Sequence, residues 1–192
     1  MFDAIDTYVN QCISLTAEEL EIFHSLLEHK VIKKKNLLLK SGDICNFEAF
    51  ILKGCVRTYY VDESGKEVDL HFAIENWWIS DLPSFTFRKP ATLNIQTLED
   101  CELLSISYEA KEKLFLDVPK FERMFRLLIQ RTHEEMMNRF ISTVSRTAEE
   151  RYETFLRKYP TIQLRVPQHR IAAYLGISPE FLSKIRSRNN GR

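Results

Sequence analysis

The chain has 192 residues, of which 44% are hydrophobic and 28% are charged. This is typical of a globular protein with enough apolar material for one large or two small domains. It has no run of about 18 apolar residues, as a membrane span requires. Its first residues lack the basic and apolar regions of a signal peptide. We therefore expect a cytoplasmic protein that does not enter a membrane.

The 27 basic and 27 acidic residues cancel over the whole chain but not within its parts. From Ser145 onward, ten Lys and Arg stand against four Asp and Glu, a net of +6, so the preceding part has a net of −6. A basic end joined to an acidic body is expected when only one part of a protein faces phosphates. A small domain can also carry such a charge by chance, so the split supports nucleic-acid binding without proving it.

The residues that most often bind metals show no site pattern. The four cysteines are scattered, without a C-x-x-C pair: Cys12, Cys45, Cys55 and Cys101. This spacing predicts neither a zinc site nor a disulfide framework, and we expect no metal and no cofactor. Four solitary histidines leave a haem ligand open, although such residues are more often ordinary core or surface residues: His24, His29, His71 and His133.

The chain opens with a predicted helix and continues with short β-prone runs. Residues Thr16 to Glu19 have the form of a capping box, and apolar residues follow at helical spacing. Seven runs rich in β-branched and aromatic residues come next, at 31–32, 37–39, 47–52, 56–61, 68–73, 93–98 and 101–106. A loop is predicted around Pro83 and Pro90. Strands at this spacing predict an antiparallel barrel or jelly roll.

Three helices are predicted after the strands. Ser107 is suited to cap a short helix through Phe115, and a pattern without Gly or Pro then continues from Val118 to about Thr143. Residues 147–150 form a second capping box, which begins a helix that Pro160 ends. Residues 143–146 are therefore the predicted hinge between the body and the basic end.

The long predicted helix has two apolar stripes, whereas a helix that only covers a barrel needs one. The first stripe contains Phe121, Phe125, Leu128, Thr132, Met136 and Phe140, and the second contains Met124, Leu127, Met137 and Ile141. We interpret the helix as a dimerisation element, with one stripe on the barrel and the other on a second copy, and we assign the first stripe to dimerisation. The alternative, in which both stripes pack within one protomer, stays open.

Residues 168–186 have the pattern of two short helices joined by a tight turn. Ala172 is small enough for a close helix crossing, and Gly176 stands where the chain must reverse, four residues later. Ser178 and Pro179 suit the cap and the first position of the second helix. These offsets predict a helix-turn-helix. A plain helical hairpin would show the apolar periodicity, but not the Ala, the Gly and the Ser-Pro pair together.

The order of helix, jelly roll, long helix and helix-turn-helix resembles the regulators related to the cyclic-AMP receptor protein, the Crp/Fnr family, in particular its compact members from the Bacteroidetes. The segments that carry the resemblance are residues 51–59, 148–152 and 170–186. It implies an α+β fold with a jelly-roll sensor domain (1–116), a dimerisation helix and hinge (117–144), and a helix-turn-helix domain (145–192) that lacks the last hairpin of the family's wing. It also implies a dimeric transcriptional regulator, not an enzyme, whose partners are a DNA operator, RNA polymerase and an effector of unknown identity.

The resemblance also implies roles for the second helix of the motif. Glu180 and Lys184 match positions that read bases in that family, Glu180 by accepting from cytosine and Lys184 by donating to guanine. Pro179 stands where the family has an Arg, so one base contact is lost. The other predicted DNA-binding residues, mostly phosphate contacts, are Gln168, His169, Ser178, Ser183, Arg186 and Arg188.

The ligand sites of the family do not carry over. Alignment places Ile79-Ser80 where family members that bind cyclic AMP have Gly-Glu, and Ala91-Thr92 where they have Arg-Ser or Arg-Thr. A buried phosphate needs a cation or several donors, so we expect no response to cyclic AMP. Arg88 is a weak candidate for contact with another effector. Only Cys12 lies near the amino end, which argues against the iron–sulfur site of the oxygen-sensing branch.

Two other classes of function were weighed. A jelly-roll metal enzyme of the cupin kind would need a His-x-His with a Glu and a further His, and the roll offers only His71. A protein-interaction module would use the C-terminal helices to bind a partner protein instead of DNA. Binding to a DNA duplex distinguishes this alternative from a regulator.

Overall fold

The computed structural model describes residues 1–190, with side chains through residue 188, and divides into two compact units. The first unit contains residues 1–58 and 72–132, and the second contains residues 59–71 and those from 133 onward. The domain boundaries expected near residues 116 and 144 stay predictions. The compact units instead divide the chain within the long helix, and they group the outer part of one β-hairpin with the C-terminal helices. The predicted absence of a wing hairpin concerns residues 189–192, of which the last two lie outside the described part.

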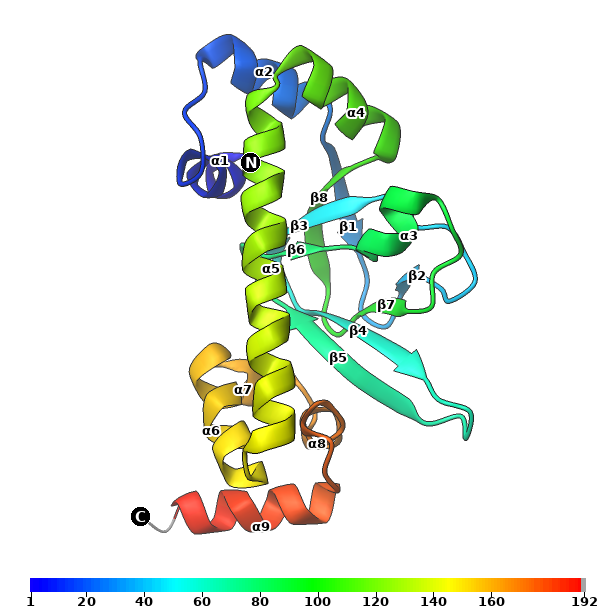
Figure 1. Cartoon of the computed structure of the whole chain (residues 1–192), viewed down its shortest axis with the longest axis vertical. Helices are drawn as coiled ribbons and strands as arrows, with labels where there is room; N and C mark the ends of the chain where they lie inside the picture. The colour runs from blue at the N-terminus through cyan, green and yellow to red at the C-terminus, as the bar shows by residue number, and fades with distance from the viewer. Residues whose placement is uncertain (191–192) are drawn as a thin grey trace. The chain divides into compact units, whose positions relative to one another are not determined.

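Two helices precede the strands of the first unit (Figure 1). Helix α1 (Asp3–Asn10) was not predicted; it buries Ile5 and Val9, which lie one turn apart. Helix α2 (Ala17–Ser25) begins at the predicted capping box, where the Glu19 backbone N–H donates to the Thr16 hydroxyl and the Thr16 N–H donates to the Glu19 carboxylate. The local pattern therefore placed the start of this helix correctly.

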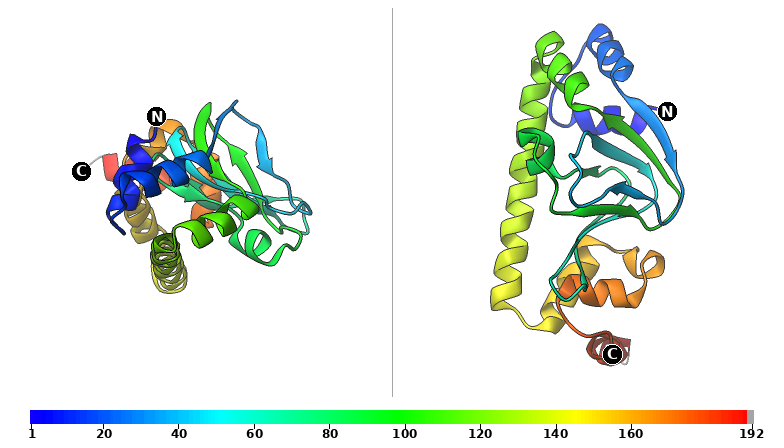
Figure 2. Two further views of the ribbon diagram at one scale, coloured as in Figure 1. Left: turned by 90° about the horizontal axis from the view of Figure 1, so that it is seen from above. Right: turned by 90° about the vertical axis from the view of Figure 1, so that its right-hand side faces the viewer.

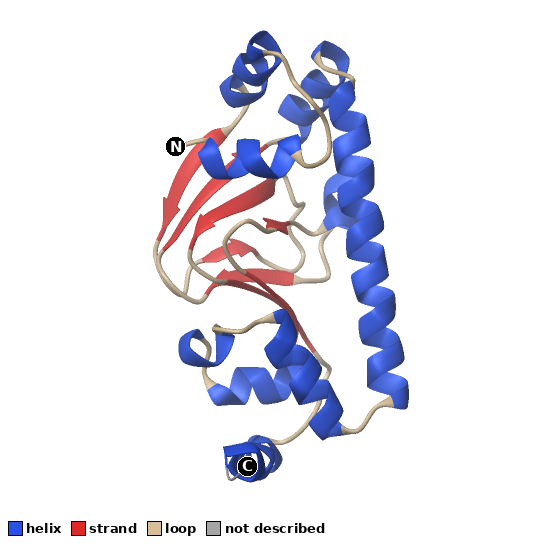
Figure 3. Cartoon of the chain, turned by 90° about the vertical axis from the view of Figure 1, so that its left-hand side faces the viewer, coloured by secondary structure: helices blue, strands red, loops and turns tan. Residues whose placement is uncertain are grey.

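The described residues form eight strands in two four-stranded sheets, in agreement with the predicted jelly roll (Figures 2 and 3). The strands of the first sheet, in spatial order, are β1 (Glu28–Ile32), β8 (Cys101–Ile106), β3 (Glu48–Lys53) and β6 (Trp78–Ile79). Those of the second are β2 (Leu37–Leu39), β7 (Asn94–Thr97), β4 (Val56–Val61) and β5 (Glu67–Ala73). Leu103 and Ile51, which are paired in the first sheet, share a buried cluster with Leu39, Val56 and Ile95 of the second. Apolar side chains from both sheets therefore fill the roll.

The predicted loop around Pro83 is in part a short helix, α3 (Leu82–Phe87). The buried Asp81 side chain accepts a hydrogen bond from the Ser84 backbone N–H at 3.1 Å, and Pro83 lies in the first turn. Proline at this place removes no hydrogen bond that a helix would use, so it favours a helix start here and does not break the helix. The loop prediction was wrong because Pro83 was interpreted without its capping residue.

Helix α4 (Tyr108–Asp117) packs on the roll through a buried ion pair. Lys111 Nζ donates to Glu48 Oε2 at 2.6 Å and lies 3.9 Å from the centre of the Phe125 ring, and the two charged side chains are only 8% and 7% exposed. Burial raises the pKa of Glu48, and the attraction of Lys111 opposes this shift. The pair fixes α4 on β3 because either charge alone would be costly to bury.

The long helix α5 (Lys120–Ser145) is buried at its start and exposed towards its end. Phe121, Met124 and Phe125 are buried in the core of the first unit, and Leu128 packs against that core. Met136 and Phe140, by contrast, are 66% and 64% exposed. The first predicted stripe is therefore not one surface. One turn takes 3.6 residues, so each step of four residues overshoots a full turn by about 40°, and the stripe winds around the helix.

The assignment of the whole first stripe to dimerisation is corrected accordingly. The side chains of Phe121 and Phe125 are enclosed by their own protomer, and Leu128 is partly covered, so they are not available to a second copy. Thr132 is exposed and donates its hydroxyl to the Leu128 carbonyl at 2.9 Å. Exposed apolar side chains instead gather on one face of the second half of the helix: Met136, Met137, Phe140, Ile141 and Val144.

Four helices follow in the second unit, α6 (Ala148–Lys158), α7 (Ile162–Arg165), α8 (Gln168–Leu175) and α9 (Pro179–Asn190). The second capping box is present, since Thr147 and Glu150 bond reciprocally at the start of α6. Aromatic rings hold the unit together: the ring centres of Phe155 and Tyr174 are 5.0 Å apart, and Tyr159 packs edge-on to Tyr174. Among the described residues, no helix is long and apolar enough to cross a membrane.

Gly54 offers a test of the roll. Its φ is +103°, and a Cβ built there would lie 2.5 Å from Cys101 Sγ and 2.8 Å from the Asp100 carbonyl oxygen. We expect Gly54→Ala to lower the free energy of unfolding by about 2–4 kcal/mol, through backbone strain and overpacking. Urea unfolding followed by the fluorescence of the two tryptophans measures it.

Gly65→Ala is the matched control, because Gly65 also has a positive φ, +80°, but a Cβ there meets nothing within 4 Å. Gly65→Ala should lower the free energy of unfolding by only about 1–2 kcal/mol, from backbone strain alone. Equal costs at the two positions would contradict the close packing of Gly54 against Cys101.

Candidate nucleic-acid interface

The turn between α8 and α9 is formed by a left-handed residue. Gly176 has a φ of +67° and a ψ of +35°, and the Ile177 N–H donates to the Ala172 carbonyl at 3.1 Å. These features close the end of α8 as a glycine C-cap does. Ala172 is fully buried, and so is Leu182 of the next helix. The predicted turn and close crossing of a helix-turn-helix are thus both present.

Helix α9 begins with the predicted cap. The Ser178 hydroxyl accepts from the Phe181 backbone N–H at 3.2 Å, and Pro179 occupies the first helical position. Leu182 and Ile185 are the buried residues of this helix among those whose side chains are described. Their spacing of three leaves the residues between them on the outer face.

The outer face of α9 carries both acidic and basic groups. A shallow depression there is lined by Glu180, Ser183, Lys184, Ser187 and Arg188, all of which are exposed. The pKa of Glu180 is lowered by hydrogen bonds from its own backbone N–H and from Ser178, so its carboxylate is ionised at neutral pH and can only accept. The face thus combines an acceptor with flexible cationic donors.

The remaining predicted DNA contacts are placed unevenly. His169 and Ser178 are exposed. Gln168 and Arg186 are partly buried and face each other, since Arg186 Nη1 donates to Gln168 Oε1 at 3.4 Å. Arg188 lies 3.8 Å from Glu149 in an exposed ion pair, which contributes little to stability. Of these residues, Arg186 is thus the least free to reach a duplex.

The second half of α5 is attached to the C-terminal helices by its polar side. The Arg139 guanidinium lies 4.0 Å from the centre of the Tyr174 ring and donates to the Tyr174 carbonyl at 3.1 Å. Lys158 of α6 donates to Glu135 at 2.7 Å. These contacts hold α5 against α6 and α8, which leaves the apolar face of its second half exposed.

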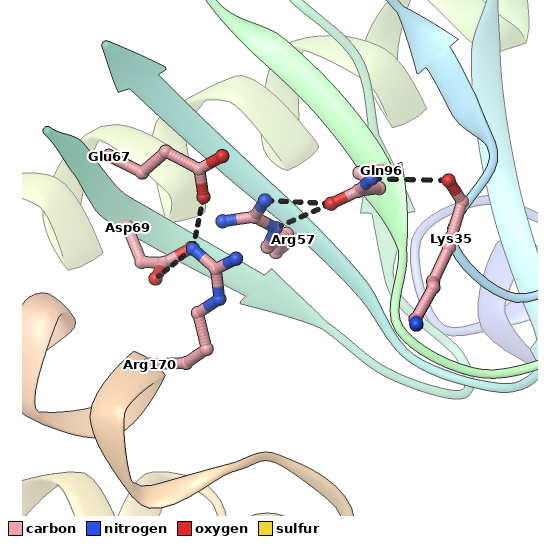
Figure 4. Close-up of polar contacts among 6 residues, drawn as sticks. All are labelled: Lys35, Arg57, Glu67, Asp69, Gln96 and Arg170. Atoms are coloured by element: carbon pink, nitrogen blue, oxygen red, sulfur yellow. Dashed lines mark hydrogen bonds and ion pairs between the residues drawn. The ribbon is translucent and has the colours of Figure 1, made fainter. Parts of the chain in front are cut away.

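Sequence reasoning missed a row of polar residues on β5. Glu67, Asp69 and His71 alternate along the strand, so their side chains share one face. Arg170, in the first turn of α8, forms an ion pair with Glu67, and its Nη1 lies 3.7 Å from Asp69 Oδ2 (Figure 4). The signal was present as two acidic residues that alternate with apolar residues in this strand, but their partner lies about a hundred residues away in the sequence.

The effector candidate and the aligned nucleotide positions lie in the first unit. Arg88 has a left-handed backbone, donates to the Cys45 carbonyl at 2.9 Å and lies 4.9 Å from the centre of the Tyr108 ring. Ser80 donates to the Phe47 carbonyl at 2.9 Å, and Ala91 is buried. In the described part of the chain, no group of three or more His, Cys, Asp or Glu residues is arranged to hold a metal ion.

Comparison with known proteins agrees with this architecture. Residues 29–117 match the family described as the cyclic nucleotide-binding domain. The N-terminal part of the chain has the fold of this domain. Among solved structures, FixK2 from Bradyrhizobium japonicum has a TM-score of 0.76 at 16% identity, covering 86% of this chain and 85% of its own. The c-di-GMP responsive global regulator CLP of Xanthomonas campestris has a TM-score of 0.71 at 16% identity, covering 92% of both chains.

Curated relatives extend the similarity over nearly the whole sequence. The transcriptional activator protein Anr of Pseudomonas aeruginosa is 24% identical over 190 residues, which span 92% of this chain and 76% of the relative. The anaerobic regulatory protein of Haemophilus influenzae is also 24% identical, over 91% of this chain and 72% of its own. The chain is thus similar to transcription regulators in its sequence and to Crp/Fnr-type proteins in its fold.

The β5 row makes the stability of the second unit depend on pH. Burial, together with the charges of Lys158 and Arg139, lowers the pKa of His71 from 6.5 to about 3. Below pH 6.5 the unfolded chain therefore binds a proton that the folded chain does not. Stability should fall as the pH drops from about 6.5 towards 3, by no more than about 1.4 kcal/mol per pH unit.

His71→Gln should flatten this dependence, and urea unfolding at pH 7, 6, 5 and 4 measures it. His169→Gln is the control, because His169 is exposed on α8. If His71→Gln loses as much stability on acidification as His169→Gln and the wild type do, a neutral, partly buried His71 imidazole is disproved.

Proposed function

We propose that this protein is a sequence-specific DNA-binding transcriptional regulator of the Crp/Fnr type that acts as a homodimer. The observation that carries the proposal is the exposed charged face of α9 on a well-formed helix-turn-helix, in a chain similar to named transcriptional activators over 92% of its length. The same similarity favours a regulator over a protein-interaction module and over an enzyme. Membership of a compact Bacteroidetes-type branch and a role in the cytoplasm are parts of the proposal.

The proposed contacts follow from the geometry of α9. In the major groove, the ionised Glu180 accepts from a cytosine amino group, and Lys184, one turn later on the same face, donates to guanine. We propose that four residues touch phosphates around them, and their exposure supports this: His169, Ser178, Ser183 and Arg188. Gln168 of α8 and Arg186 of α9 are joined by a hydrogen bond. They contact DNA only if this bond opens.

Lys184→Ala should weaken binding to a selected operator by about 1–2 kcal/mol, or roughly five- to thirtyfold in Kd, because one base contact is lost. It should also relax the preference at a single base pair. Fluorescence anisotropy with a duplex selected by the wild-type protein from a random pool measures both effects.

Lys40→Ala removes the same charge from an exposed position just after β2, in the first unit, and should change Kd by less than about twofold, since it removes no base contact. Circular dichroism confirms that both variants are folded. If Lys184→Ala binds as the wild type does, the base contact of Lys184 is contradicted; if the wild type selects no duplex from the pool, a protein-interaction role is favoured over DNA binding.

The proposed dimer surface is the apolar face on the second half of α5. Met136, Phe140 and Val144 follow at helical spacing and are 64–73% exposed, and Met137 and Ile141 lie beside them. Pairing with the same face of a second copy would bury these side chains in a coiled-coil-like contact. Two copies also give two recognition helices, which must lie about 34 Å apart to read successive turns of DNA.

Phe140→Glu should convert the dimer to a monomer at micromolar concentration, because two carboxylates would be buried against each other at the symmetric contact. Asn138→Glu adds the same group to an exposed position about half a turn away on the same helix and should leave the dimer intact. Sedimentation velocity distinguishes the two species. A wild-type protein that sediments as a monomer, free and on DNA, overturns the dimer.

An effector and RNA polymerase remain proposed partners of unknown site. The positions aligned with the cyclic-AMP contacts hold Ile79-Ser80 and Ala91-Thr92, which offer no cation for a cyclic phosphate. Arg88 is already engaged with the Cys45 carbonyl and the Tyr108 ring, so it is a weak effector ligand. We therefore propose that the protein does not respond to cyclic AMP.

A further inference from the structure

The outer part of the β4–β5 hairpin belongs to the same compact unit as the C-terminal helices. Residues 59–71 carry four acidic residues, Asp62, Glu63, Glu67 and Asp69, against one basic residue, Lys66. The C-terminal helices of the same unit, by contrast, carry a net positive charge. This part of the hairpin is therefore a local source of negative potential within the DNA-binding unit.

Two of these carboxylates converge on one guanidinium. Glu67 and Asp69 are two residues apart on β5, so they point to the same side of the strand, and both reach Arg170 of α8 (Figure 4). Asp69 is fully buried, and the Arg170 side chain is 23% exposed. The guanidinium thus lies in a half-buried acidic cradle.

Arg170 is also placed beside the predicted phosphate contacts of α8. It lies in the first turn, next to Gln168 and His169, at the helix end whose free N–H groups favour anions. A guanidinium binds a carboxylate and a phosphate with the same planar donor geometry. Glu67 and Asp69 therefore bind a guanidinium, that of Arg170, which could equally bind a DNA phosphate.

We propose that Glu67 and Asp69 act as built-in phosphate mimics that hold Arg170 in the DNA-free protein and restrain operator binding. When the hairpin moves away from α8, the Arg170 guanidinium becomes free to bind a phosphate of the DNA backbone. The proposal rests on the DNA-binding function and adds its regulation: whatever displaces β4 and β5, two strands of the roll, changes the affinity of α8 for a duplex. The restraint is electrostatic, because a phosphate that approaches α8 meets the partly exposed Glu67 carboxylate and an arginine that is already neutralised.

The decisive variant is Glu67→Gln, which keeps the length of the side chain and the charge of Arg170. It should tighten binding to the selected duplex about two- to fivefold, the range expected for loss of one partly exposed ion pair. Arg170, then held by Asp69 alone, should add up to one phosphate contact, which steepens the log–log dependence of binding on salt by up to about 0.9. Anisotropy titrations at four salt concentrations measure both quantities.

Glu63→Gln is the matched control, because it removes the same charge from an exposed position on the same hairpin. It should leave the salt slope unchanged and alter Kd less than Glu67→Gln does. Adding Arg170→Gln should abolish the gain from Glu67→Gln. The proposal is overturned if the two glutamate variants behave alike, or if the gain persists without Arg170.

Hydrogen exchange of the DNA-free protein separates a failure of this mechanism from a failure of the proposed function. Glu67→Gln and Arg170→Gln should each speed amide exchange in residues 59–71, and Glu63→Gln should not. If the wild type binds no DNA, the proposed function fails, and the cradle is still judged by exchange. If neither Glu67→Gln nor Arg170→Gln changes the rate of amide exchange in residues 59–71, the cradle is refuted, even when the protein binds DNA.

Discussion

The chain reversal at Gly176 is the constraint on which the DNA-binding face depends. A left-handed residue at this point turns the chain within the three residues between α8 and α9, and the small buried Ala172 lets the next helix come close. Helix α9 then has one face to bury, which takes Leu182 and Ile185. Glu180 and Lys184 are thereby placed on the other side, whereas Arg186 stays partly buried against Gln168 of α8. The display of Glu180 and Lys184 is thus a consequence of apolar packing and needs no contact of its own.

The long helix shows how one element serves two surfaces in succession. Its first turns bury Phe121, Met124 and Phe125 in the core of the first unit, and the apolar residues of its last turns stay exposed. In the second half, the polar residues Glu135 and Arg139 make the intramolecular contacts. An apolar face left open beside satisfied polar contacts is unfavourable for a lone protomer in water. A second copy of the chain that packs on this face would remove these apolar side chains from water.

Features that depend on neighbouring residues could be predicted from the sequence. The capping boxes at Thr16 and Thr147 and the turn at Gly176 each need only a few residues in the right order, and all are present. The other described strands followed from their runs and turns, but the short β6 (Trp78–Ile79) did not. Helix α3 was missed although Asp81 and Pro83 form a valid helix start, because the proline was weighed as a breaker.

Features that depend on distant parts of the chain could not be predicted in this way. The two stripes of α5 are both apolar, and only the place where the roll ends decides which residues are buried. Likewise, nothing near Arg170 indicates that its partners lie on β5. The charge split along the sequence pointed to phosphates as partners of the basic end, but it did not reveal that part of the acidic body supplies a competing partner within the same unit.

Two ion pairs between a strand and a helix show how burial decides the use of a charge. Glu48 and Lys111 are almost fully buried, so breaking their pair would strand a charge in the core, and α4 is fixed on the roll. Glu67 and Arg170 are partly exposed, so water and salt can replace each partner at a modest cost. The first pair therefore suits a permanent joint. The second suits a contact that opens when a stronger anion arrives, and a DNA backbone, with one charge about every 1.7 Å, is such an anion.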